Sequence, residues 1–153
     1  FCGLEKPAAR FAAIWKIRDS SVELGRAIGP NGVGFDISLA IDKMEAFAAR
    51  IREAARKIDK DAYAIVFGHA GDGNLHLNVK YPPTVDRTEE ITKIVYGITG
   101  DFAGSISAEH GIGILKRPYL KLSRTEEEIE TMRTLKRALD PHHILNPGRI
   151  FTI

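Results

Sequence analysis

Apolar residues recur every three or four positions in four stretches of the chain, namely residues 9–27, 41–58, 86–102 and 126–139. This spacing places them on one face of a helix, so each stretch is predicted to be helical. The pattern is clearest in the second stretch, whose apolar face would consist of Ile41, Met44, Ala48, Ile51, Ala55 and Ile58. A helix with such a face packs it against another element.

Four other stretches are predicted to be strands. Residues 33–39 and 74–81 alternate between apolar and polar positions, as a strand does when only one of its faces is buried. Residues 62–69 form a nearly continuous apolar run, which indicates a central strand covered on at least one face. Residues 104–108 fit a short fourth strand.

The order of these elements predicts the fold. The middle of the chain reads strand, helix, strand, strand, helix, strand, which is the βαββαβ order of a ferredoxin-like sandwich. We therefore expect an α+β fold with a four-stranded, mainly antiparallel sheet, helices on one face, and an extra helix at each end. Residues 9–153 would form one domain, and residues 1–8, which lack periodicity, are interpreted as a linker or the remnant of one.

Composition narrows the class of protein. With 153 residues, of which 44% are hydrophobic and 27% charged, the chain has the make-up of a soluble globular domain. Its 22 basic and 20 acidic residues are mixed, so no basic block indicates nucleic acid. The sequence has no membrane-length apolar run or secretory signal, and its one cysteine, Cys2, fits a reducing compartment. We therefore expect a cytoplasmic protein, and a first residue other than Met suggests a fragment.

Polar groups that could carry chemistry concentrate in residues 68–78, GHAGDGNLHLN. His69 ends one predicted strand and His76 lies near the start of the next, so a hairpin would bring the two imidazoles together, and the intervening glycines permit a tight turn. Asn78 lies on the same strand face as His76. The simpler alternative is a hairpin whose histidines are solvated or hydrogen-bonded.

A second polar stretch, residues 107–113, contains Glu109 and His110 before two glycines. A carboxylate added to two histidines makes the three-ligand set of catalytic zinc sites, which leaves a coordination position open. Manganese or iron could accept the same ligands. The alternative is that Glu109 and His110 form an exposed loop pair.

Other candidates are less specific. Arg18, on the first predicted helix, could bind a substrate carboxylate in bidentate fashion, or could be a solvated arginine paired with a neighbouring acid. Lys116 and Arg117 could line the same pocket or be exposed. The sequence has no dinucleotide fingerprint, phosphate loop or nucleophile elbow, so a redox cofactor would have to be bound by another domain.

Three motifs in this order resemble the C-terminal domain of FAD-linked oxidases. They are residues 68–76 (GHAGDGNLH), residues 107–113 (SAEHGIG), and the segment from residues 139–141 (LDP) through 146–149 (NPGR). The resemblance extends from about Ile14 to Ile150. It points to the group that contains D-lactate dehydrogenase, glycolate oxidase and D-2-hydroxyglutarate dehydrogenase, within the vanillyl-alcohol-oxidase superfamily.

The resemblance implies roles for particular residues. By analogy, His69, His76 and Glu109 would bind a divalent metal, with zinc the first choice, and His110 would be the base that removes the hydroxyl proton. An FAD-binding domain would precede this one in the full protein and be its principal partner.

The resemblance also implies how substrate and flavin are held. Arg18 would bind the substrate carboxylate, Asn78 would bind the substrate, and Asn146 would approach the flavin. Relatives that act on dicarboxylic hydroxy acids tend to carry a lysine just before the aromatic-Asp pair, where this chain has Gly34. We therefore expect a smaller monocarboxylate such as lactate or glycolate.

The sequence thus predicts the substrate- and metal-binding domain of an FAD-dependent D-2-hydroxy acid dehydrogenase, which passes hydride to the flavin. The isolated fragment should be inactive. Peripheral membrane association of the full protein and a homodimer are left open. The alternatives are a non-catalytic ferredoxin-like interaction module and a self-sufficient metal hydrolase that uses the same residues.

Overall fold

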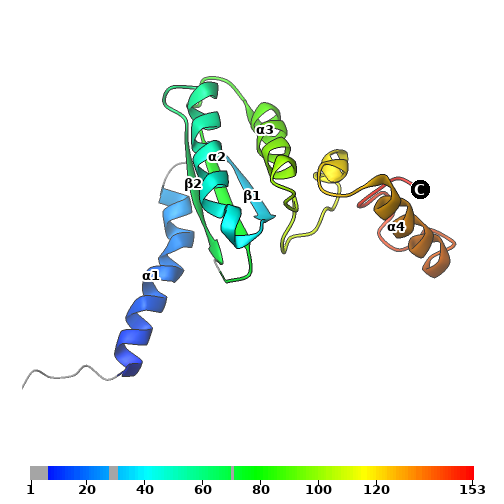
Figure 1. The fold of residues 1–153 in the computed structure, drawn as a ribbon, viewed down its shortest axis with the longest axis horizontal. Coiled ribbons are helices and arrows are strands. Elements are labelled where there is room, and N and C mark those ends of the chain that lie inside the picture. The colour runs from blue at the N-terminus through cyan, green and yellow to red at the C-terminus, as the bar shows by residue number, and fades with distance from the viewer. Residues whose placement is uncertain (1–6, 28–30, 70) are drawn as a thin grey trace, which may run out of the picture. The chain divides into compact units, whose positions relative to one another are not determined.

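The computed structural model describes residues 7–27, 31–69 and 71–153. The chain divides into two compact units, Phe1–Asn31 and Gly32–Ile153. In the first unit, helix α1 (Pro7–Ala27) confirms the helix predicted at residues 9–27 (Figure 1). Most of the segment interpreted as a linker, residues 1–6, lies outside the described residues.

The second unit is α+β, as predicted (Figure 1). Short 3-10 helices precede α2 and α4. The predicted helices at 41–58, 86–102 and 126–139 are confirmed as α-helices, the first two beginning two or three residues late. In chain order the elements are β1 (Gly32–Ser38), α2 (Met44–Ile58), β2 (Tyr63–His69), β3 (Asn74–Lys80), α3 (Thr88–Asp101) and α4 (Glu126–Leu139).

The described sheet has three strands in the order β1-β3-β2, and β3 is antiparallel to both neighbours. The central strand is therefore β3, and the prediction that residues 62–69 form a central strand is wrong. β2 lies at an edge, and its apolar run is only partly buried, because alternate residues face away from α2. A continuous apolar run therefore gives neither the burial of both strand faces nor the number of neighbouring strands.

The core lies between one face of the sheet and helices α2 and α3. The predicted alternation in β3 is confirmed, since Leu75, Leu77 and Val79 are all buried on this face. Full burial of one such side chain stabilises the fold by about 1.5–3 kcal/mol. The other residues of β3, beginning with His76 and Asn78, therefore lie on the opposite, polar face of the sheet.

The predicted four-stranded ferredoxin-like sheet does not form within the described residues. In place of a strand at 104–108 there is a single antiparallel bridge, Ser38 to Ser105. It has two backbone hydrogen bonds, Ser38 N to Ser105 O at 3.0 Å and Ser105 N to Ser38 O at 2.8 Å. Beyond this bridge the chain turns away: the Ser107 amide donates to Ser105 Oγ, and the amides of residues 108–110 donate to the carboxylate of Asp36.

The hairpin between β2 and β3 depends on Gly73. This residue has φ +79°, and a Cβ atom built on it would lie 2.2 Å from the carbonyl oxygen of Leu39. The Leu39 amide donates to Gly73 O at 2.9 Å. Glycine alone fits this backbone angle and close approach without strain.

No helix in the described parts of the chain is long and apolar enough to cross a membrane.

Candidate active site on the polar face of the sheet

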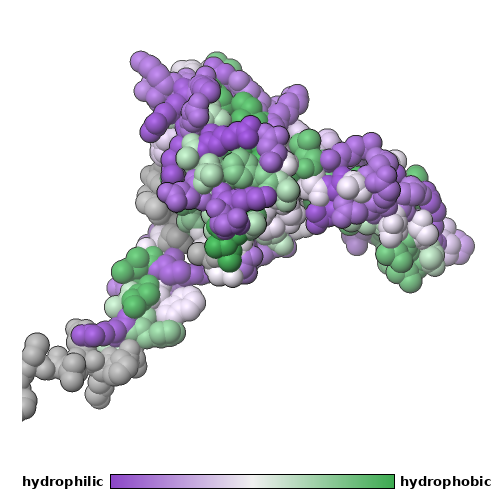
Figure 2. Space-filling view, in the orientation of Figure 1, coloured by the Kyte–Doolittle hydropathy of each residue, from purple (hydrophilic) through white to green (hydrophobic). Residues whose placement is uncertain are grey.

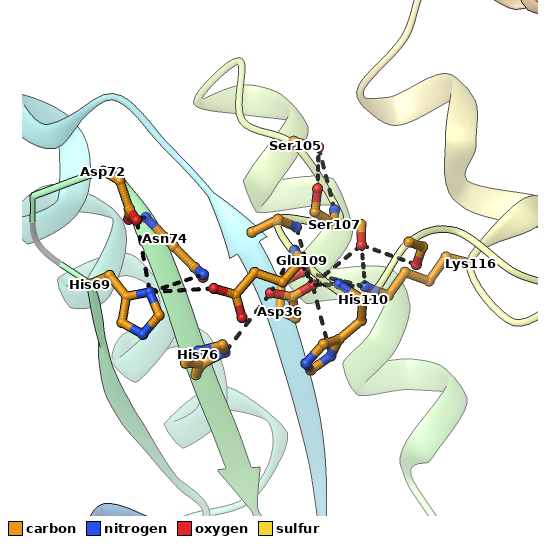
Figure 3. Close-up of polar contacts among 12 residues, drawn as sticks. Asp36, His69, Asp72, Asn74, His76, Ser105, Ser107, Glu109, His110 and Lys116 are labelled. Carbon is orange, nitrogen blue, oxygen red and sulfur yellow. Dashed lines mark hydrogen bonds and ion pairs between the residues drawn. The ribbon is translucent and has the colours of Figure 1, made fainter. Parts of the chain in front are cut away.

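Strand register assembles a polar surface on the face of the sheet opposite the core. Asp36 of β1 pairs with His76 of β3, which pairs with Phe67 of β2, so these three side chains form one row across the sheet. The next row contains Asn74 and His69. Figure 3 shows Asp36, His76, Asn74 and His69 of these rows beside Glu109 and His110 of the loop that follows α3.

His69 meets the acidic residue of the second motif. Its Nδ1 atom lies 3.4 Å from Oε1 of Glu109 and 3.8 Å from Oδ2 of Asp72 (Figure 3). The side-chain amide of Asn74 lies 3.4 Å from the same nitrogen. The other amide atom of this buried asparagine, Oδ1, has no hydrogen-bond partner among the described residues. Nitrogen and oxygen atoms that could bind a metal therefore gather around His69.

Three imidazole rings lie side by side. The rings of His69 and His76 are 5.5 Å apart in an edge-to-face arrangement, which confirms the predicted proximity of these two residues. The ring of His110 stacks on His76 at 6.1 Å. On its other side His76 contacts Phe67, at 5.6 Å between ring centroids. The two glycine-containing motifs thus meet in space.

Asp36 is the residue of this cluster that sequence reasoning missed. Its side chain is 1% exposed, and its Oδ2 atom accepts the backbone amides of Ala108 at 3.1 Å, Glu109 at 3.0 Å and His110 at 2.9 Å. The Nδ1 atoms of His76 and His110 lie 3.9 and 3.8 Å from its oxygens, beyond hydrogen-bond length. The sequence did show an acidic residue at a polar position of an alternating strand. It did not show that this residue pairs with His76, because the pairing depends on the register of β1 with β3.

Burial acts to raise the pKa of Asp36, but its hydrogen bonds and charged neighbours outweigh this effect. The backbone amides of His110 and Glu109, and then the Lys116 ammonium, bring the pKa below its usual value. Asp36 is therefore an anion at neutral pH. Its negative charge lies beside the imidazole rings of His76 and His110.

Lys116 belongs to the cluster, whereas Arg117 does not. The Lys116 ammonium is 2.9 Å from Ser107 Oγ, 3.4 Å from Asp36 O and 3.6 Å from Asp36 Oδ2, and its side chain is 15% exposed. Burial lowers its pKa, against the opposing effect of Asp36. Arg117 instead donates to Gly148 O at 2.6 Å and fixes the C-terminal segment.

Among the described residues, one set of three donor atoms lies close enough together to hold a metal ion: one atom each from Asp36, Glu109 and His110 lies within 4.8 Å of the others. It shares only Glu109 with the predicted set, His69, His76 and Glu109. Asp36 already accepts several hydrogen bonds that a metal would have to displace. Two imidazoles and a carboxylate, the predicted donors, suit zinc.

The remaining predicted residues lie elsewhere. Asn78 shares the polar face with His76 and lies opposite Gly34, where a Cβ atom would be 3.3 Å from its Oδ1. Arg18 belongs to the other compact unit, so its contact with a substrate here stays a prediction. Within α1 it pairs with Asp19 at 3.2 Å and lies over the Trp15 ring, as the solvated alternative would have it.

Asn146 lies in the C-terminal segment, in a left-handed conformation with φ +47°. Together with neighbouring residues it lines a cavity of about 430 Å³. Exposed apolar side chains gather close to this segment, at the C-terminal end of α4 (Figure 2). They are Leu135, Leu139, Ile144 and Leu145.

The chain belongs to the C-terminal domain family of FAD linked oxidases, whose model matches residues 4–150. It is 39% identical over 149 residues to a D-2-hydroxyglutarate dehydrogenase of Xanthomonas citri pv. viticola, covering 94% of this chain and 31% of that protein. It is 40% identical over 144 residues to the enzyme of the same name from Stutzerimonas stutzeri, covering 90% and 31%. For the glycolate oxidase subunit GlcD of Bacillus subtilis, the identity is 32% over 143 residues, covering 91% and 30%.

The chain therefore spans less than a third of the length of these curated relatives. Membership of an FAD-linked family implies FAD as the cofactor of the complete protein.

Proposed function

We propose that this chain is the substrate- and metal-binding domain of an FAD-dependent D-2-hydroxy acid dehydrogenase. The observation that carries the proposal is the meeting of His69, His76, Glu109 and His110 on the polar face of the sheet. A purely structural hairpin would not need three imidazoles and a carboxylate within contact distance of one another. The names of the related proteins agree on the substrate class, a carboxylate with an adjacent hydroxyl group.

His69, His76 and Glu109 would hold the divalent metal, with zinc the first candidate. When bound there, such an ion polarises the substrate hydroxyl, while FAD accepts hydride from the α-carbon. The carboxylate of Asp36 faces Nδ1 of His76, so Nε2 is the nitrogen left for a ligand.

His110 would accept the hydroxyl proton. Its side chain is 67% exposed, so a substrate can reach it, and its Nδ1 atom faces the Asp36 carboxylate at 3.8 Å. An imidazole titrates near neutral pH and suits this role. The nearby carboxylate would stabilise the imidazolium that forms after proton transfer.

Arg18 and Asn78 would orient the substrate, and Asn146 would approach the flavin. Asn78 lies on the same face as the histidines, which supports its part in the proposal. The exposed apolar residues at the end of α4 fit a surface that the FAD-binding domain covers, because large apolar patches usually meet a partner.

Lactate or glycolate is the proposed substrate, and 2-hydroxyglutarate, named in several relatives, is the competitor. Gly34 leaves the position opposite Asn78 without a charged side chain to bind a second carboxylate.

The test is to mix the full-length flavoprotein anaerobically with D-lactate, glycolate and D-2-hydroxyglutarate and to follow loss of the flavin absorbance. D-Lactate or glycolate should bleach the flavin fastest, and L-lactate is the stereochemical control. Fastest bleaching by D-2-hydroxyglutarate would overturn the substrate choice alone. Intact flavin absorbance with every hydroxy acid would overturn the proposed function.

A further inference from the structure

The turn that carries Glu109 and His110 is held by one carboxylate. Asp36 Oδ2 accepts three consecutive backbone amides, those of Ala108, Glu109 and His110, at 2.9–3.1 Å. Asp36 lies on β1, in a sheet strand whose position is fixed by its register with β3. The carboxylate therefore ties an irregular loop to the sheet (Figure 3).

Ser107 and Lys116 complete the arrangement. Ser107 Oγ lies 3.3 Å from Asp36 Oδ2 and 3.0 Å from Gly111 O, and it receives a hydrogen bond from the Lys116 ammonium at 2.9 Å. The ammonium also balances the buried negative charge of Asp36 at 3.6 Å. A buried charge is tolerated only with partners of this kind, so the five donors and the anion act as one unit.

The exposed side chains of the turn depend on this anchor. Residues 107–113 contain no helix or strand, so no regular hydrogen-bond pattern fixes Glu109 and His110. Their side chains are 49% and 67% exposed, and their side-chain contacts are limited to the approach of Glu109 to His69 and the stacking of His110 on His76. The backbone gives the firmer attachment, and Asp36 holds it directly at both residues.

We propose that Asp36 is a positioning residue. It fixes the Glu109–His110 turn so that the metal ligand Glu109 and the base His110 are both correctly placed for the substrate. The proposal rests on the proposed function for its kinetic readout. It assigns Lys116 to the same anchor, because its ammonium contacts Ser107 and Asp36 and is turned away from solvent. The rival is that Asp36 is itself a metal ligand.

The first experiment is Asp36→Asn in the full-length flavoprotein. We expect kcat to fall about 10- to 100-fold, the scale of small misplacements of catalytic groups, while KM for the hydroxy acid changes far less. Loss of stability alone would lower the amount of folded enzyme but not kcat per folded active site. Unchanged kcat in folded Asp36→Asn would overturn the proposal.

The second experiment tests whether Asp36 only anchors the turn or is itself a metal ligand. The parent protein and Asp36→Asn are loaded with Co²⁺, and their visible spectra are recorded. If Asp36 is only an anchor, Asp36→Asn keeps the band positions of the parent protein. A shift to a different coordination spectrum would make Asp36 a ligand and overturn the proposal. Absence of bound metal in the parent protein would count against the proposed function and leave the kinetic test of Asp36 in place.

Amide hydrogen exchange supplies a readout that needs no metal. Asp36→Asn should deprotect the amides at residues 108–110 and leave those at 144 and 145 unchanged. Asp140→Asn is the matched control, since Asp140 is also buried, pairs with Lys136 and accepts the amides of Ile144 and Leu145. Asp140→Asn should deprotect the amides at 144 and 145 and leave those at residues 108–110 unchanged.

Ser107→Ala covers the case in which Asp36→Asn does not fold. It removes the hydroxyl that links Lys116 to the turn and leaves the carboxylate in place. We expect a smaller fall in kcat with an unchanged Co²⁺ spectrum. Equal kcat in Ser107→Ala and the parent protein would contradict the proposed anchor.

Discussion

Nδ1 of His69 lies 3.4 Å from Oε1 of Glu109, although one residue ends strand β2 and the other lies in the loop beyond α3. At this distance the two atoms are in contact, but the separation is too long for a strong hydrogen bond. It is the spacing of two donors able to approach one cation from neighbouring directions. This relationship joins the two sequence motifs into one site.

The first prediction concerns metal binding. The chain should bind one divalent ion, and His76→Ala should weaken binding by at least roughly 10-fold, because loss of one of three ligands removes a coordination bond. Calorimetric titration with Zn²⁺ measures the effect. His142→Ala, which alters an exposed histidine after α4, is the control. Equal affinities in His76→Ala and the parent chain would contradict the assigned ligand set.

The second prediction concerns the base. His110→Ala in the full-length protein should lower turnover about 100-fold or more, the usual contribution of a general base. Metal content should be retained, since His110 is not in the assigned ligand set. Steady-state kinetics together with metal analysis check both parts. Near-normal turnover would show that another group takes the proton.

The third prediction concerns the hairpin. Gly73→Ala should destabilise the second unit by roughly 1–3 kcal/mol, because a left-handed φ costs that much in other residues and the new Cβ meets Leu39 O. Gly71→Ala is the matched control, since no atom lies within 4 Å of its Cβ position.

Urea unfolding followed by circular dichroism measures this difference. Fluorescence is unsuitable, because the single tryptophan, Trp15, belongs to the other unit. A Gly71→Ala variant less stable than Gly73→Ala would show that the turn does not depend on close approach to Leu39.

The fourth prediction concerns acid. The hydrogen bond from Lys136 lowers the pKa of Asp140 to about 2 despite its burial, with further help from the amides of Leu145 and Ile144. A carboxyl whose pKa is lower in the folded than in the unfolded state stabilises the fold above the unfolded value, here near 3.8. That stabilisation is lost as the pH falls through about 2.

The stability difference between the parent chain and Asp140→Asn should therefore be constant above about pH 4 and shrink between about pH 4 and pH 2. Urea titrations at a series of pH values measure it. A difference that grows on acidification would have the wrong sign and would rule out a depressed pKa at Asp140.

The fifth prediction concerns the isolated chain, which should be colourless and without dehydrogenase activity. The FAD-binding domain is expected to hold the flavin, and this chain spans less than a third of its relatives. Absorbance between the near ultraviolet and the visible, and a dye-reduction assay, check both points. A yellow, active preparation would show that the flavin site lies within these residues.

The spacing of apolar residues predicted the helices and the alternating strands. It reflects which face of an element is buried, and this can be read from a short stretch of sequence. It failed where the answer depends on partners distant in the chain. The apolar run at 62–69 became an edge strand, since neighbours in the sheet are set by chain topology. The stretch 104–108 made only the Ser38–Ser105 bridge.

The same distinction applies to the candidate site. Residue type and glycine spacing singled out His69, His76, Glu109 and His110, and their proximity follows from a hairpin and a loop. Asp36 was not singled out, because a lone acidic residue in a strand usually faces solvent. Its burial arises from the loop that folds over it, and only the three-dimensional arrangement shows this.

Because only one bridge forms at residues 104–108, the backbone that follows depends on a single side chain, Asp36. A longer strand at 104–108 would have distributed its hydrogen bonds over several backbone carbonyls, which no point mutation removes. Here three amides share the oxygens of one aspartate. A single substitution at Asp36 is therefore expected to lower kcat in a protein that still folds, an effect larger than burial alone would indicate.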